Sequence, residues 1–267
     1  MLKKNKLALF GLVILSTFVL LAVFAPLIAP YGPSDIIEDS IASPSLDHIF
    51  GTDDLGRDIL SRLFYGGRVS LSVAVIAVTV SLTIGVFLGS ISGYYGGILD
   101  EIIMRFTDIM LSFPTIFLIL AIQSVLTPSI FNVMIVIGAT SWMGIARLVR
   151  GEFLALKERE FVEAARAIGC SNLRIIFRHI LPNSLSPIIV AGTLGMAGAI
   201  LTESAISFLG LGVQPPMPSW GNMLMDSQSY LLDAPWMAVI PGMVIVLAVL
   251  SLYFIGEALR EGSNPKE

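Results

Sequence analysis

Long apolar runs alternate with short polar segments along almost the whole chain, and this alternation predicts membrane-spanning helices. The first run, 7–29, would reach roughly 34 Å at about 1.5 Å per residue, which is enough to cross a bilayer. Five further runs predict spans over about 70–92, 106–126, 130–148, 187–208 and 236–256. The pattern therefore predicts an all-α membrane protein with six transmembrane helices.

The first run has a second interpretation, because Lys3, Lys4 and Lys6 precede it as they would precede a cleaved signal peptide. The apolar core of a signal peptide is usually about 7 to 15 residues long, and this run is well beyond that. A retained first span is therefore favoured.

Glycines within the spans indicate where helices approach closely. Gly85 and Gly89 form a GxxxG pair in the second span, although glycines facing lipid remain the alternative. Gly192, Gly195 and Gly198 recur at three-residue steps in the fifth span. We expect the fifth helix to pack in the centre of the bundle.

The amino-acid composition excludes several other classes of protein and of site. A mean hydropathy of +0.85, with 55% hydrophobic and 13% charged residues, excludes an ordinary soluble domain. Cys170 is the one cysteine, so an intrachain disulfide cannot form. With His48 and His179 as the two histidines and no CxxC or HExxH, we expect no metal site.

Positive charges are distributed unequally between the two sides of the six predicted spans. Arg57, Arg62 and Arg68 fall on one side, and the remaining thirteen Lys and Arg residues fall on the other. This asymmetry predicts that both termini are cytoplasmic. The outer segment also carries acidic residues that suit either a docking surface for an external protein or plain solvated surface: Asp35, Glu38, Asp39, Asp47, Asp53, Asp54 and Asp58.

The expected division of the chain follows from the spans and the orientation. Residues 1–29 form a cytoplasmic N-terminus and first helix, 30–69 an external segment, 70–256 a five-helix core and 257–267 a cytoplasmic tail. Within the external segment, apolar positions at one side predict a short helix lying along the outer interface: Leu55, Ile59, Leu60, Leu63 and Phe64.

The cytoplasmic loop 150–186 contains a polar and basic stretch, 163–182, that predicts two short helices. Gly169 stands between them, where a left-handed helix end is easiest, Ser171 is the expected N-cap of the second helix, and Pro182 is expected to end it. An apolar stripe follows the second helix: Leu173, Ile176, Phe177 and Ile180. Such a loop can contact a soluble partner, or it can lie on lipid headgroups.

The order Glu163-Ala164-Ala165, three residues, Gly169 and, further on, Leu181-Pro182 resembles the EAA loop of permease subunits of binding-protein-dependent ABC importers. His179 departs from the aliphatic residue of the general pattern. The string RHILPN looks like the peptide and nickel branch of that family. The strings GTDDLGRDILSRL and LGLGVQPPMPSWG are similar to the same branch.

The resemblance implies the type I ABC importer permease fold in a bacterial or archaeal plasma membrane. It implies a second related permease subunit, one or two kinds of cytoplasmic ATPase and an extracytoplasmic binding protein as partners, and no nucleic acid. ATP and Mg would bind the ATPases, and this chain would bind no cofactor. Peptides are the substrate implied first, with nickel or a metal chelate as the alternative.

The resemblance also implies which residues of the loop dock into an ATPase. Glu163, Ala164, Ala165 and Gly169 would shape the loop, and Arg166, Arg174 and Arg178 would make charged contacts. The residues implied to seat the loop against the bundle are Leu173, Phe177 and Leu181, and His179 and Pro182 complete the motif.

The sequence lacks GxxxxGK[ST], so the chain is not expected to bind ATP phosphates itself, and no catalytic set is present. Glu203 lies inside the fifth span, so it either contacts substrate or a gate, together with Ser207 and Trp220, or makes a structural hydrogen bond. The candidate partners for that bond are Ser204, Ser207 and the outer loop 209–235. Asp108 is expected to pair with Arg105.

Two other classes of function remain open at this point. A secondary transporter or channel would need ion-coupling groups within the spans, for which Glu203 alone is thin support. A membrane scaffold would explain the bundle but not the loop 163–182.

Overall fold

A computed structural model describes residues 5–37 and 40–263 of the chain, and these residues form helices and loops, with one isolated β-bridge between Thr52 and Asp58. The helices of the bundle are α1 (Lys6–Val23), α2 (Ala25–Ile28), α3 (Ile59–Tyr95), α4 (Gly97–Ser112), α5 (Thr115–Val125), α6 (Ile130–Ala139), α7 (Met143–Leu156), α10 (Leu185–Phe208) and α12 (Trp236–Ser263). The short elements outside it are α8 (Glu160–Ala167), α9 (Asn172–Ile175) and α11 (Trp220–Asp226).

Four of the described helical segments are long and apolar enough to cross a membrane, and two bent helix pairs raise the number of candidate spans to six. The four are α1, α3, α12 and the continuous stretch Asn172–Phe208 that ends with α10. The bent pairs are α4 with α5 and α6 with α7. The predicted all-α membrane fold with six spans is confirmed in its order along the chain.

The third and fourth predicted spans are not straight helices, which corrects the sequence-based expectation. The axes of α4 and α5 differ by 84° and those of α6 and α7 by 41°. Pro114 precedes α5 and holds the preceding Phe113 at an extended ψ of 131°, so the helix cannot continue through it. Thr140 ends α6, where its hydroxyl bonds the Val136 carbonyl at 2.7 Å.

The ends of α3 also differ from the prediction. The expected interfacial helix is not separate, because α3 begins at Ile59 and runs through Gly66 and Gly67. Asp58 caps it by accepting the Ser61 N–H at 2.7 Å. The predicted second span ends at residue 92 and the third begins at 106, but α3 continues to Tyr95 and α4 starts at Gly97, so only Gly96 separates the two helices.

At the C-terminus, the segment expected as a polar tail after residue 256 continues α12 to Ser263. Lys3, Lys4, Glu38, Asp39 and Lys266, which entered the charge count above, lie outside the described residues.

The predicted close approach at Gly85 and Gly89 is confirmed, because both glycines face α7. A Cβ added to Gly85 would lie 2.7 Å from Ile145, and one on Gly89 would lie 2.5 Å from the Ala146 carbonyl oxygen. In α10, Gly192 faces Leu82 of α3. Glycine thus allows α3 to pack closely against α7 and α10.

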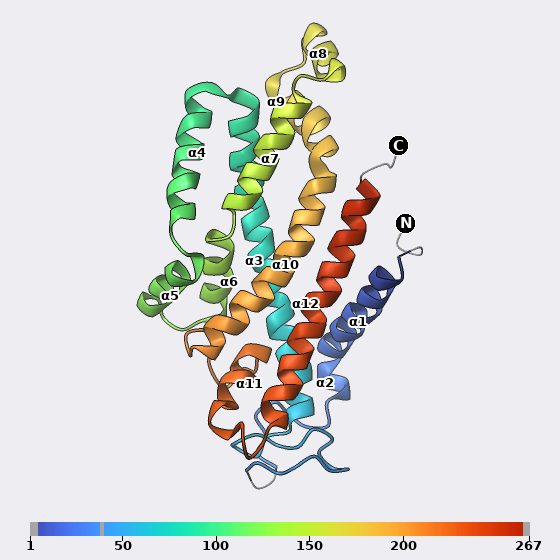
Figure 1. The fold of residues 1–267 in the computed structure, drawn as a ribbon, viewed down its shortest axis with the longest axis vertical. Helices are drawn as coiled ribbons and strands as arrows, with labels where there is room; N and C mark the ends of the chain where they lie inside the picture. The colour runs from blue at the N-terminus through green and yellow to red at the C-terminus, as the bar shows by residue number, and fades with distance from the viewer. Residues whose placement is uncertain (1–4, 38–39, 264–267) are drawn as a thin grey trace.

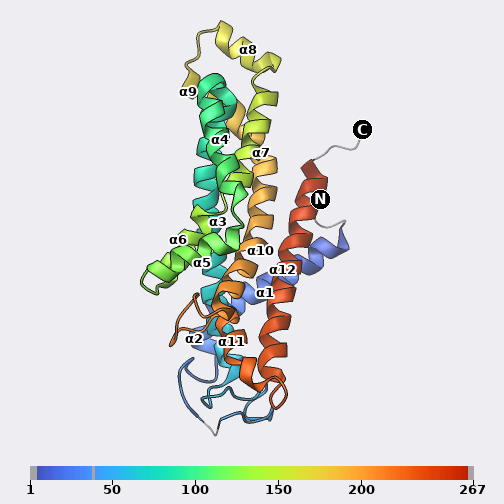
Figure 2. The ribbon, with the colours of Figure 1, turned by 60° about the vertical axis from the view of Figure 1, so that its left-hand side comes forward.

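The two ends of the bundle carry different structures (Figures 1 and 2). The loop with α8 and α9 projects from one end, called here the α8 end. The segments 29–37 and 40–58 and helix α11 lie together at the opposite end, called here the α11 end. The bent α4–α5 pair forms an arm along one side of the bundle (Figure 1).

Candidate functional site

Gly169 ends α8 in the left-handed conformation that the sequence predicts. Its φ is +80°, the N–H of Gly169 bonds the Arg166 carbonyl at 2.9 Å, and the N–H of Cys170 bonds the Ala165 carbonyl at 3.0 Å. These two bonds form a Schellman motif, which satisfies carbonyls that a helix end would leave unpaired. Ser171 occupies the N-cap position of α9 as predicted, but its side chain makes no capping bond.

The loop 157–184 packs on the bundle through one shared cluster of buried apolar side chains. Val162 and Ala165 of α8 and Ile175 of α9 are buried and join one cluster with Val149 and Phe153 of α7. The Tyr94 hydroxyl at the end of α3 also donates to the Asn172 side-chain oxygen at 2.8 Å. A loop that packs closely on α3 and α7 transmits a displacement to these helices better than a flexible, unpacked loop would.

The apolar stripe of the second loop helix is only half correct as predicted. Ile176 and Ile180 are buried, and Leu181 packs against their cluster, but Leu173 and Phe177 are each 64% exposed. Residues Ile176–Ile180 form a π-helical turn, in which positions five apart align, so Ile175 and Ile180 point inward together. The 3.6-residue period therefore placed Leu173 and Phe177 on the wrong side.

The consequence is an exposed face with apolar and basic side chains, called here the loop face. Ile168, at the end of α8, is also exposed, at 81%. The charged and small residues expected to contact a partner are also exposed: Glu163, Ala164, Arg166, Arg174 and Arg178. Exposed apolar side chains rimmed by cations are typical of a protein or membrane contact.

Pro182 does not end the helix, contrary to the prediction. It lies in a 3-10 turn, Leu181–Ser184, that leads directly into α10. Local π and 3-10 geometry tolerates a proline because the bonds of the turn are rearranged. The half-buried His179 supports this rearrangement through its carbonyl, which accepts the Asn183 amide at 2.6 Å.

The ion pair expected between Asp108 and Arg105 is replaced by a pair across helices. The carboxylate of Asp108 on α4 meets the guanidinium of Arg147 on α7 at 2.5 Å, and both side chains are about half exposed. The spacing of Arg105 and Asp108 gives information only about neighbours on one helix. The contact between α4 and α7 could not be predicted from it.

At the α11 end, the fully buried Glu203 makes structural hydrogen bonds. Ser207 donates to its Oε1 at 2.7 Å and Ser70 of α3 donates to its Oε2 at 3.1 Å, whereas Ser204 makes no such bond. The backbone N–H of Trp220 donates to the Ser70 hydroxyl at 3.2 Å. Glu203 therefore connects α10 to α3 and, through Ser70, to α11.

The Trp220 indole makes a further contact between α11 and α3. It is 2% exposed, and its Nε1 donates to the Leu63 carbonyl at 3.1 Å. A Cβ on Gly67 would lie 3.1 Å from the indole, so a glycine there lets the ring approach α3. The loop 209–235 is thus held against the bundle by buried polar contacts and an aromatic side chain.

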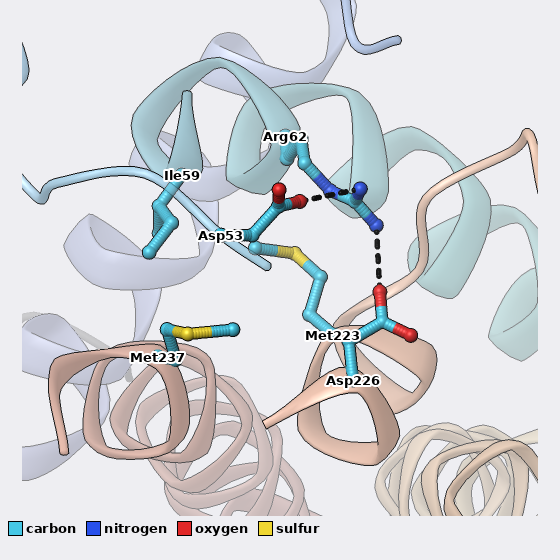
Figure 3. Close-up of a pocket in the computed structure, with 6 residues that line it drawn as sticks. All are labelled: Asp53, Ile59, Arg62, Met223, Asp226 and Met237. Atoms are coloured by element: carbon cyan, nitrogen blue, oxygen red, sulfur yellow. Dashed lines mark hydrogen bonds and ion pairs between the residues drawn. The ribbon is translucent and has the colours of Figure 1, made fainter. Parts of the chain in front are cut away.

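Several carboxylates of the acidic outer segment form ion pairs within the protein, namely Asp53, Asp54 and Asp58. The hypothesis that the acidic segment docks an external protein is therefore not supported for these three residues. Asp53 contacts Arg57 and Arg62 at 2.7 Å each, and Arg62 reaches Asp226 of α11 at 3.1 Å (Figure 3). His48 lies 2.9 Å from Asp58 in the interior. Asp35 and Asp47 are exposed, so plain solvated surface and docking both remain open for them.

Carboxylate oxygens of Asp53, Asp54 and Asp226 lie within 4.8 Å of one another. Arg62 bonds both Asp53 and Asp226 (Figure 3), so we assign no metal to this cluster. Burial raises the pKa of the Asp226 carboxyl, while the neighbouring Arg62 acts in the opposite direction. Sequence reasoning missed Asp226 and Ser70, because nothing in the local pattern connects residues so far apart.

Comparison with known proteins gives concordant matches over nearly the whole chain. The family model described as "Binding-protein-dependent transport system inner membrane component" matches residues 85–266. A second model, "N-terminal TM domain of oligopeptide transport permease C", matches residues 1–44.

The chain is 50% identical to the dipeptide transport system permease protein DppC of Alkalihalophilus pseudofirmus, over 99% of this chain and 88% of the relative. It is 40% identical to the oligopeptide transport system permease protein OppC of Bacillus subtilis, over 99% and 87%.

Solved structures are similar at the level of the fold. An inward-facing MetNI methionine ABC transporter chain matches with a TM-score of 0.61 at 18% identity, over 76% of this chain and 96% of that chain. An amino acid ABC transporter chain matches with a TM-score of 0.54 at 15% identity, over 73% and 89%.

Proposed function

The chain belongs to the family of binding-protein-dependent transport system inner membrane components, and from this membership we propose that it forms half of the translocation pathway of an ATP-driven peptide importer. It is a multi-pass permease subunit, a transport component. Relatives at 40 to 50% identity are named for dipeptides and oligopeptides, which favours peptides over the nickel alternative.

The loop face is the proposed docking site for a cytoplasmic ATPase. The observation that carries this assignment is the combination of exposed Leu173 and Phe177 with Arg174 and Arg178 on a segment whose buried side chains pack on α7. Buried aromatic and aliphatic anchors provide most of the free energy of protein association, and cations at the rim select the partner. Glu163, Ala164, Ala165 and Gly169 give the loop its shape in this proposal.

The motor is assigned to the partners. This chain has no phosphate-binding loop, so ATP and Mg would bind the ATPases, one or two kinds of which would dock here. Differential binding of the two bundle states by the closed ATPases would drive the change of access. A second permease subunit would form the other half of the pathway, and a binding protein would deliver peptide at the α11 end.

This assignment fixes the orientation in the bacterial or archaeal plasma membrane. The α8 end and both termini would be cytoplasmic, in agreement with the excess of Lys and Arg there. The contacts of Glu203, Ser207 and Trp220 would hold the outer loop closed over the pathway, which makes these residues structural parts of an outer gate.

Uptake measurements test this function directly. We expect vesicles that hold the two permeases and the ATPases to accumulate a labelled dipeptide only with Mg-ATP and the binding protein. A companion complex with an ATPase variant that binds but does not hydrolyse ATP should lose uptake by at least about a hundredfold.

Uptake that follows an ion gradient without ATP would instead identify a secondary transporter. A complex that accumulates labelled nickel but no peptide would overturn the substrate assignment, while leaving the importer assignment in place.

A further inference from the structure

A partly buried bidentate ion pair joins α7 and α4 near the base of the loop 157–184. The Nε of Arg150 on α7 donates to Oδ1 of Asp100 at 2.6 Å, and its Nη2 donates to Oδ2 at 2.6 Å. Ser92 of α3 also donates to Oδ1 of Asp100. The side chains of Arg150 and Asp100 are 34% and 17% exposed. Charge-assisted bidentate pairs of this kind fix geometry more strongly than a single contact does.

Ser92 lies near the end of α3, Asp100 near the start of α4, and Arg150 in the middle of α7. Arg150 lies on α7, which continues into α8, and Asp100 lies in the first turn of α4. At this level α3 and α7 touch through their backbones, because a Cβ on Gly93 would lie 2.8 Å from the Arg150 carbonyl oxygen. A displacement of the loop that moves α7 would therefore also move Arg150.

Few other side chains hold α4 to the bundle, and one of them is Met110, which packs against the buried cluster of Trp142, Met143 and Ala146. Thr107 is its one buried residue, whereas Ile98, Ile102 and Ile109 are more than half exposed. Phe106 stacks on Trp142, and the exposed pair of Asp108 with Arg147 adds a weak contact. The Asp100–Arg150 pair is thus the most specific connection of α4 to α7.

Helix α4 also carries α5, because only the bend at Phe113 and Pro114 separates them. Ile119 and Gln123 of α5 are buried, so this helix packs into the bundle nearer the α11 end (Figure 2). The ion pair of Asp100 with Arg150 therefore connects the loop 157–184, through α4, to the more distant helix α5.

We propose that Asp100 and Arg150 are positioning residues that make the α4–α5 arm follow α7 when the ATPases displace the loop. The inference rests on the proposed function and deepens it: the loop acts on two parts of the bundle, α10 through the continuous chain and α4–α5 through this ion pair. Loss of the pair leaves the ATPases docked but separates their cycle from the arm.

Charge reversal and charge exchange test the proposal in the complete complex in vesicles. The variants are Asp100→Arg, Arg150→Asp and the double exchange, with Asp100→Asn as a milder change. Each is assayed for bound ATPase, for basal hydrolysis, and for hydrolysis and peptide uptake stimulated by the binding protein.

We expect each single variant to keep the ATPase and its basal hydrolysis, while uptake per bound ATPase falls by about tenfold or more. The double exchange should restore uptake to within about threefold of the parent, because the opposite charges face each other again. Arg147→Asp, which breaks the exposed pair on the same two helices, should change uptake by less than about twofold.

Uptake within twofold of the parent in Asp100→Asn and both reversals would overturn the inference. So would a double exchange no better than the single variants, or a loss in Arg147→Asp as large as that in Arg150→Asp. Failure of the parent complex to bind an ATPase would instead overturn the proposed function, so the two failures are distinguishable.

Discussion

Replacing Leu173 and Phe177 together by aspartate is expected to release the ATPases from the complex and to lower ATP-driven uptake by at least about a hundredfold. Both side chains are 64% exposed, so neither contributes much to the core of the loop. In a docked complex they would be desolvated, and a buried unpaired carboxylate is strongly unfavourable. The measurement is the amount of ATPase that co-purifies with the permeases, followed by peptide uptake in vesicles.

Leu232→Asp provides the matched control, because Leu232 is 96% exposed in the loop before α12, at the α11 end. That variant should retain the ATPases in full. If Leu173→Asp with Phe177→Asp retains them equally well, the loop face is not the docking site.

The second large effect is expected at Gly169, where a valine should lower uptake by about tenfold to a hundredfold and an asparagine by only about threefold or less. The φ of +80° is unfavourable for a β-branched residue, whereas asparagine enters the left-handed region more readily. No atom lies within 4 Å of a Cβ built on Gly169, so steric contact does not contribute to the difference. Uptake and ATPase binding are measured for both variants.

Gly151→Val is the control for adding a β-branched side chain near the loop. Gly151 is exposed on α7, within a regular helix, and its Cβ would also meet open space. Transport should remain near that of the parent. Equal activity of the valine and asparagine variants at Gly169 would mean that the left-handed helix end does not matter for coupling.

The parts of this fold that the sequence predicts are those set by local rules. The Schellman end at Gly169 follows from one residue's conformational freedom, and the Gly85 and Gly89 contacts follow from small side chains at one spacing. The start of α10 at Leu185 lies within two residues of the predicted boundary at Pro187.

The parts that sequence reasoning missed depend on partners distant in the chain or on irregular helix geometry. Arg62 of α3 and Asp226 of α11 form an ion pair at the α11 end. In its own segment of the sequence, each looks like an ordinary surface charge. The π-helical turn rotates Phe177 outward, which a regular helical period cannot anticipate. The 84° bend before α5 needs Pro114, but its size depends on how α5 packs.

Site-directed photo-cross-linking can identify which protein contacts the loop face in the assembled complex. Cys170 is the one native cysteine, so a Cys170→Ser background allows a thiol-linked photoreactive probe to be placed at Phe177→Cys or at Leu232→Cys. In the assembled complex the probe at position 177 should capture an ATPase subunit, and the probe at position 232 should capture none. Capture of lipid alone by the probe at position 177, or of the ATPase by the probe at position 232, would contradict the proposal that the loop face is the docking site for the ATPase.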